Sequence, residues 1–125
     1  MKIFNKVSTI IAAGLMAFFS IPKLIGVEES VQGFEQFKSL VPLDPNLFRI
    51  FTGIVELSIA LLLIVYVVKN TINLGKLAYF LLLSTMMGAL TMEFFARPEP
   101  EMMLVVIALV LAALSVFRLK MLFNK

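Results

Sequence analysis

The sequence contains no cysteine, no histidine and no tryptophan among its 125 residues. The absence of cysteine excludes disulfide bonds, thiol redox chemistry and cysteine metal sites within the chain. The absence of histidine removes the usual imidazole ligands of haem, zinc and copper. We therefore expect no metal site and no intrinsic cofactor. A role in electron transfer would depend on a cofactor supplied by a partner or by a mobile ligand.

Charge is also scarce, since charged residues make up 15% of the chain and hydrophobic residues 61%. An average soluble domain carries roughly 25% charged and 45–50% apolar residues. The length predicts a single domain over residues 1–125. So small a domain buries only about 60–70% of its unfolded surface, so the remaining apolar surface must face lipid. No nucleic-acid-binding motif, phosphate loop or hydrolytic triad is present, and the expected partner is the lipid bilayer.

Four apolar stretches are long enough to cross a bilayer as helices, since about 20 helical residues span a core of about 30 Å. They cover about residues 7–27, 47–68, 77–96 and 102–118. None alternates apolar and polar residues as the strands of a membrane barrel do. The sequence therefore predicts an all-α protein, a transmembrane four-helix bundle. We expect Arg118 and Lys120 to extend the short fourth helix by snorkelling, and Tyr66 and Tyr79 to anchor at the same interface.

The connection between the first two stretches has a pattern of its own. Val31, Phe34, Phe37 and Val41 follow one another at helical spacing, with Glu35 and Lys38 between them. That pattern favours a short amphipathic helix lying in the membrane interface.

The positive charges predict an orientation. Seven of the eleven basic residues fall on the side that holds both chain ends, namely Lys2, Lys6, Lys69, Lys76, Arg118, Lys120 and Lys125. The four others and all eight acids fall on the opposite side or in the adjoining helix portions. Because lysine and arginine concentrate in cytoplasmic loops, we expect a multi-pass protein of the inner (cytoplasmic) membrane with both termini cytoplasmic.

Four charged residues lie within the apolar stretches: Lys23, Arg49, Glu56 and Glu93. Such charges are expensive in a bilayer and indicate function by default. Glu56 lies about 13 Å below the outer boundary, close to the midplane, and the others lie within about two turns of the outer face. Arg49, Gly53 and Glu56 share one helix face, being spaced i, i+4 and i+7. The small Gly53 allows a helix or a ligand to approach that face.

We therefore interpret Lys23, Arg49, Gly53, Glu56 and Glu93 as candidate ligand-binding residues in the outer half of the membrane. The long Lys23 side chain is expected to contact Glu56, with Arg49 and Glu93 nearer the mouth of the site. The alternative is that these charges form structural ion pairs between helices. No catalytic residue is assigned, although Glu56 is the candidate for an acid or base.

Several short motifs resemble the DoxX-like family of small membrane proteins. The segment ending Ile21-Pro22-Lys23-Leu24 is similar to the end of the family's first helix. Gly53-Ile54-Val55-Glu56-Leu57 resembles its Gly-x-x-Glu-Leu motif, and Gly88-Ala89 its third-helix Gly-Ala pair. The resemblance covers nearly the whole chain and implies a four-helix membrane bundle. It carries over Lys23, Gly53, Glu56, Gly88 and Ala89 as family-pattern positions.

Three functions follow from these observations and stay open at this point. The first is binding of a hydrophobic ligand, a quinone or a lipid, in support of a membrane redox complex. The resemblance favours it, since the family takes its name from a subunit of a thiosulfate:quinone oxidoreductase. The second is an assembly or chaperone subunit that binds another membrane protein. The third is an enzyme acting on a lipid, with Glu56 donating or accepting a proton.

Overall fold

The computed structural model describes residues 3–37, 44–95 and 102–124 of the chain. Within these ranges it is helical and contains no strand. The elements are α1 (Ile3–Ile25), α2 (Glu28–Phe37), α3 (Pro45–Lys69), α4 (Ile72–Phe95) and α5 (Met102–Phe123). Some charged residues used above to predict the orientation lie outside the described residues: Lys2, Lys38, Arg97, Glu99, Glu101 and Lys125.

Helices α1, α3, α4 and α5 are each long and apolar enough to cross a membrane. Their 22 to 25 residues correspond to lengths of about 33 to 38 Å, which exceed the hydrocarbon core of a bilayer. Many large apolar side chains on their outer faces are exposed, as is expected of helices whose surroundings are lipid. The predicted all-α membrane bundle is thus confirmed.

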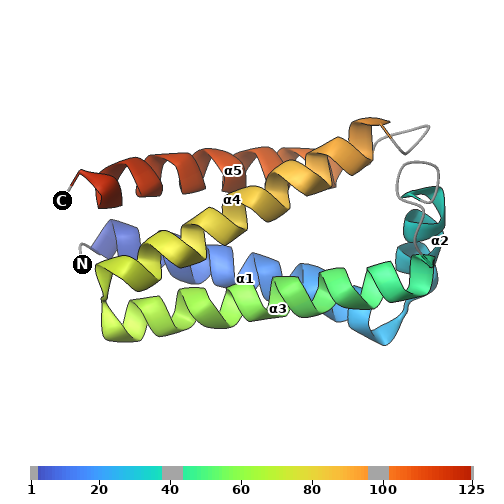
Figure 1. Ribbon diagram of the computed structural model, residues 1–125, viewed down its shortest axis with the longest axis horizontal. Coiled ribbons are helices and arrows are strands. Elements are labelled where there is room, and N and C mark those ends of the chain that lie inside the picture. The colour runs from blue at the N-terminus through green and yellow to red at the C-terminus, as the bar shows by residue number, and fades with distance from the viewer. Residues whose placement is uncertain (1–2, 38–43, 96–101, 125) are drawn as a thin grey trace.

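The four long helices pack as two pairs, α1 with α3 and α4 with α5, and α3 contacts α4. Both chain ends lie at one end of the molecule, and α2 lies at the other (Figure 1). Small residues occupy the seams and let the helices approach closely, among them Ala12, Ala13, Ala60 and Ala78. We call the two ends of the bundle the termini end and the α2 end.

The connection after α1 begins with a turn that the sequence encodes locally. Gly26 adopts the left-handed conformation with φ of 84°, which a residue with a side chain rarely adopts. Its backbone N–H and that of Val27 both donate to the carbonyl of Pro22, which closes the last turn of α1. At the start of α3, the Asp44 side chain accepts a hydrogen bond from Asn46 N, and Pro45 occupies the first turn.

A ten-residue helix, α2, does occupy the first connection. Its Phe34 is buried and packs edge-on against Phe48 of α3, with ring centroids 5.2 Å apart. Met92 of α4 packs against the same cluster. Helix α2 therefore covers the end of the bundle, while its position in the membrane interface stays a prediction.

Helix α5 runs to Phe123, beyond the range that hydropathy predicted. The extension carries Arg118 inside the helix, where it is 1% exposed. The expectation that Arg118 snorkels to the interface was therefore wrong. Tyr66 and Tyr79 are buried as well, at 2% and 0% exposure, so they are not interfacial anchors in this structure. Hydropathy misplaced all three because their polar atoms find partners on other helices, Arg118 with Tyr66 and Tyr79 with Thr9.

Candidate functional site

A close helix contact brings the first two predicted site residues together. A Cβ placed on Gly53 would lie 3.0 Å from Leu24 Cδ2 and 3.2 Å from Lys23 Cβ. The absence of a side chain at Gly53 therefore lets α3 approach α1 at this level. Glu56 lies one turn further along the same face of α3, directly beside Lys23.

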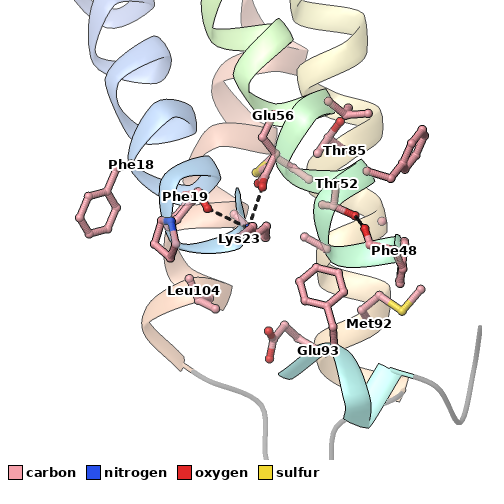
Figure 2. A pocket seen from close by; sticks show the side chains of 18 of the residues that line it. Phe18, Phe19, Lys23, Phe48, Thr52, Glu56, Thr85, Met92, Glu93 and Leu104 are labelled. Atoms are coloured by element: carbon pink, nitrogen blue, oxygen red, sulfur yellow. Dashed lines mark hydrogen bonds and ion pairs between the residues drawn. The ribbon is translucent and has the colours of Figure 1, made fainter. Parts of the chain in front are cut away.

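Lys23 and Glu56 form the contact that the sequence predicted. The Lys23 ammonium nitrogen lies 2.7 Å from Glu56 Oε1. The same nitrogen donates to the carbonyl of Phe19 at 3.3 Å and lies 5.6 Å from the centroid of the Phe19 ring. Figure 2 shows Lys23 reaching across from α1 to the carboxylate on α3. The pair is secluded, since the Glu56 side chain is 5% exposed and the Lys23 side chain 20%.

The ion pair does not use all the hydrogen-bonding capacity of its members. An ammonium group has three N–H donors, and Lys23 has two acceptors within the described part of the chain. A carboxylate oxygen has two lone pairs, so the buried Glu56 Oε1, which is paired with Lys23, can accept from one further donor. A donor brought by a ligand would add a second hydrogen bond to this buried carboxylate and so stabilise the site.

Arg49 does not lie at the mouth of the site, where the sequence predicts it. Its guanidinium donates to the backbone carbonyl of Lys23, in the last turn of α1. It also packs against Gly26, where a Cβ would come within 3.1 Å of Nη1. Arg49 is 8% exposed and thus caps the carboxyl end of α1, where a positive charge complements the helix dipole. It supports the Lys23 backbone and does not line the cavity described next.

A cavity of about 460 Å³ lies beside the ion pair, toward the α2 end of the bundle. Side chains from all five helices line it, and most are apolar. The aromatic members are Phe18, Phe19, Phe34, Phe48 and Phe51. The volume lies within the roughly 300–1,000 Å³ that is typical of small-molecule sites.

The cavity reaches the outer surface of the bundle. Three of its lining side chains, Phe18, Phe51 and Met103, are themselves 61%, 64% and 59% exposed. At the α2 end, the packed rings of Phe34 and Phe48 form part of its wall. A molecule dissolved in the bilayer could therefore enter from the side, between helices, without crossing the aqueous phase.

Five polar side chains line this cavity: Lys23, Thr52, Glu56, Thr85 and Glu93. Of the five predicted site residues, the structure thus brings three to the cavity. Glu93 comes from the last turn of α4, is 5% exposed and lies near Met92 at the α2 end of the site (Figure 2). Arg49 and Gly53 shape the α1–α3 seam behind it.

Sequence reasoning missed two groups of lining residues. The first is the α4 wall around Thr85, which includes the family-pattern positions Gly88 and Ala89. The second is the α5 wall, made by Met103, Leu104 and Ala108. Among these residues, only Gly88 and Ala89 stand out in the sequence, as family-pattern positions to which no role is assigned.

A second polar cluster, at the termini end, was not predicted at all. Arg118 donates from Nη2 to the Tyr66 hydroxyl at 2.6 Å. The Tyr79 hydroxyl lies 2.5 Å from Thr9 Oγ1, which itself donates to the carbonyl of Asn5 at 2.7 Å. One residue from each of the four long helices takes part, so these contacts tie the two helix pairs together.

Comparison with known proteins gives one match. The sequence model described as the DoxX-like family matches residues 7–115 of the chain. That range includes Lys23, Gly53, Glu56, Gly88 and Ala89. The chain shows no significant similarity to a curated protein or to a solved structure.

Proposed function

Since the chain belongs to the DoxX-like family and encloses a mostly apolar cavity between its helices, we propose that it binds a hydrophobic ligand there, a quinone or a lipid. The observation that carries the proposal is the Lys23–Glu56 pair in the wall of a 460 Å³ cavity. Apolar pockets with a few convergent polar groups are the usual form of small-molecule sites.

The chemistry of the pair defines what the ligand must offer. Lys23 can donate a further hydrogen bond, and Glu56 Oε1 can accept a further one beside that from Lys23. A quinone offers carbonyl oxygens to Lys23, and its reduced form offers a hydroxyl to Glu56. The aromatic walls suit a flat ring or an acyl chain, whose remainder would extend through the lateral opening into the bilayer.

Binding of a quinone by the Lys23–Glu56 pair would give the protein a role in a membrane redox process. The chain has neither the cysteines nor the histidines that hold most redox centres. It would therefore serve a membrane redox complex by presenting or storing a mobile quinone. The family resemblance, through the thiosulfate:quinone oxidoreductase subunit, supports this reading.

The second candidate is an assembly subunit that binds another membrane protein. The use of Arg49 and Gly53 in packing α1 against α3 favours it, because the buried charges then serve as structural ties. In this case the cavity has no dedicated occupant, and the protein is purified with a partner chain.

The test is mass spectrometry of small molecules retained by the protein after transfer to lipid nanodiscs. The Ala108→Leu variant fills the cavity, and Ala113→Leu adds the same bulk on an exposed position of α5. A quinone or a defined lipid retained by the parent and by Ala113→Leu, but lost in Ala108→Leu and in Glu56→Gln, supports the proposal. An empty parent, or one lipid mixture in all four proteins, contradicts it and favours the assembly role.

We further propose that both termini are cytoplasmic, in the inner membrane. Because the chain has no cysteine, single introduced cysteines report the side directly. Lys6→Cys, near the amino terminus, should be protected from an impermeant maleimide in intact cells, and Glu28→Cys, at the α2 end, should be labelled. The reverse pattern would overturn this orientation.

A further inference from the structure

The buried Arg118 at the termini end has no counter-charge within the described part of the chain. Its side chain is 1% exposed, and the partners that the structure gives it are the Tyr66 and Tyr79 hydroxyls, the Met121 sulfur and two aromatic rings. All of these are neutral. A buried charge without an opposite charge is costly, and arginine does not lose its proton.

The guanidinium also has donors left over. Of its five N–H groups, one donates to the Tyr66 hydroxyl at 2.6 Å, another meets the weakly accepting Met121 Sδ at 3.8 Å, and the guanidinium also interacts with the Tyr79 hydroxyl. The Nε–H has no acceptor among the described residues. Because the Tyr66 hydroxyl accepts from Arg118, its own proton is available to a further acceptor. Arg118 Nε and the neighbouring Tyr66 hydroxyl can therefore both donate to an incoming acceptor.

The aromatic rings around Arg118 set the shape of this site. The guanidinium carbon lies 6.0 Å from the centroid of the Tyr66 ring and 5.7 Å from that of Tyr79. The two rings meet edge-on, with centroids 6.2 Å apart. Rings at these distances attract the cation and so favour its observed position.

Met121 contacts this group through its sulfur, 3.8 Å from Arg118 Nη1. It lies one turn beyond Arg118 on α5, two residues before the helix end at Phe123, and is partly exposed. A methionine side chain is unbranched and changes rotamer easily. Movement of the Met121 side chain would expose the Nη1 edge of Arg118. The hydrogen bond lost is a weak one, because the thioether is the poorest acceptor in the cluster.

We propose that Arg118 and Tyr66 form a second binding site, for a phosphate group, which a bound ligand enters by displacing the Met121 side chain. Arginine binds phosphate through parallel N–H donors, and the Tyr66 proton supplies a third. Exposed lysines at the same end, Lys6, Lys69 and Lys120, attract anions toward it. The phosphate comes from an anionic phospholipid of the adjoining leaflet or from a soluble phosphate compound.

The experiment uses the full chain in phosphatidylcholine nanodiscs, with phosphatidylglycerol or inorganic phosphate as the probe. Native mass spectrometry counts retained phosphatidylglycerol, and thermal unfolding reports stabilisation by inorganic phosphate. We expect Arg118→Met and Tyr66→Phe each to weaken binding about tenfold or more, as the loss of a charge-assisted hydrogen bond implies. Met121→Ala should strengthen binding, because it removes the obstruction.

The matched control is Lys120→Met, which removes an exposed positive charge from the same helix and should leave most of the binding intact. Binding of phosphatidylglycerol alone identifies a lipid site, and stabilisation by inorganic phosphate identifies a site for soluble phosphate. The proposal is overturned if neither probe binds. It is also overturned if Lys120→Met loses as much binding as Arg118→Met, or if Tyr66→Phe and Met121→Ala both behave as the parent.

Discussion

Replacement of Glu56 by glutamine tests the buried ion pair directly. The substitution keeps the shape of the side chain and removes its charge, which leaves the Lys23 ammonium without an anion at 2.7 Å. Removal of one partner of a buried pair typically costs about 3–5 kcal/mol. The Lys23 side chain is 20% exposed and keeps its hydrogen bond to the Phe19 carbonyl. We therefore expect the low end of that range, about 3 kcal/mol.

The assay is reversible unfolding in bicelles, for example by steric trapping, applied to a double-mutant cycle. The cycle comprises Glu56→Gln, Lys23→Met and the double variant. Because each single variant leaves the other partner unsatisfied, the double variant should be less destabilised than the sum of the two, with a coupling of about 1–3 kcal/mol. Glu35→Gln, an exposed glutamate on α2, is the control and should change stability by less than about 0.5 kcal/mol.

A coupling below about 0.5 kcal/mol would refute this reasoning, since that is the scatter seen between independent sites. Lys23 and Glu56 would then be separately solvated or protonated, and the contact would contribute nothing to holding α1 against α3.

Three further predictions use the same unfolding assay. Gly53→Ala should lower the stability of the protein by about 1–3 kcal/mol, because its Cβ would meet α1 at 3.0 Å. Gly14→Ala, whose Cβ would have nothing within 4 Å, is the control and should not lower it. Equal stability of the two variants would contradict the close contact between α1 and α3. Gly75→Ala should lower the stability at least as much, because its Cβ would lie 2.6 Å from the Tyr66 ring. An unchanged stability would mean that this ring moves freely. Tyr79→Phe should cost about 1 kcal/mol by removing the hydrogen bond to Thr9; no loss would show that the bond is not formed.

Much of the fold could be predicted because it depends on local properties of the chain. Four apolar stretches and the rise of a helix are enough to predict a four-helix membrane bundle. The spacing of Gly53 and Glu56 placed both on one face, and the length of Lys23 made the contact with Glu56 foreseeable. These inferences needed no knowledge of how the other helices pack.

The remainder depends on contacts between distant residues. Arg118 pairs with Tyr66, 52 residues away, and Tyr79 with Thr9, 70 residues away. Neither polar pair can be recognised from the sequence around it, so snorkelling was the natural expectation. Arg49 shares a helix face with Glu56, yet its partner is a backbone carbonyl of another helix.

The cavity was still less accessible to sequence reasoning. Its walls come from every helix, and its volume is what remains after all of their side chains have packed. Residues such as Thr85 and Ala108 have no feature that would distinguish them from other membrane-facing or core positions.

The central claim is that the cavity beside Lys23 and Glu56 holds a hydrophobic ligand. An experimental structure of the protein in nanodiscs made with its native membrane lipids tests it most directly. The account predicts continuous density within the cavity, with one polar end at hydrogen-bonding distance from Lys23 Nζ and the remainder passing out beside Phe18 or Phe51. A cavity closed by movement of its walls, or one holding only water around the ion pair, would contradict it.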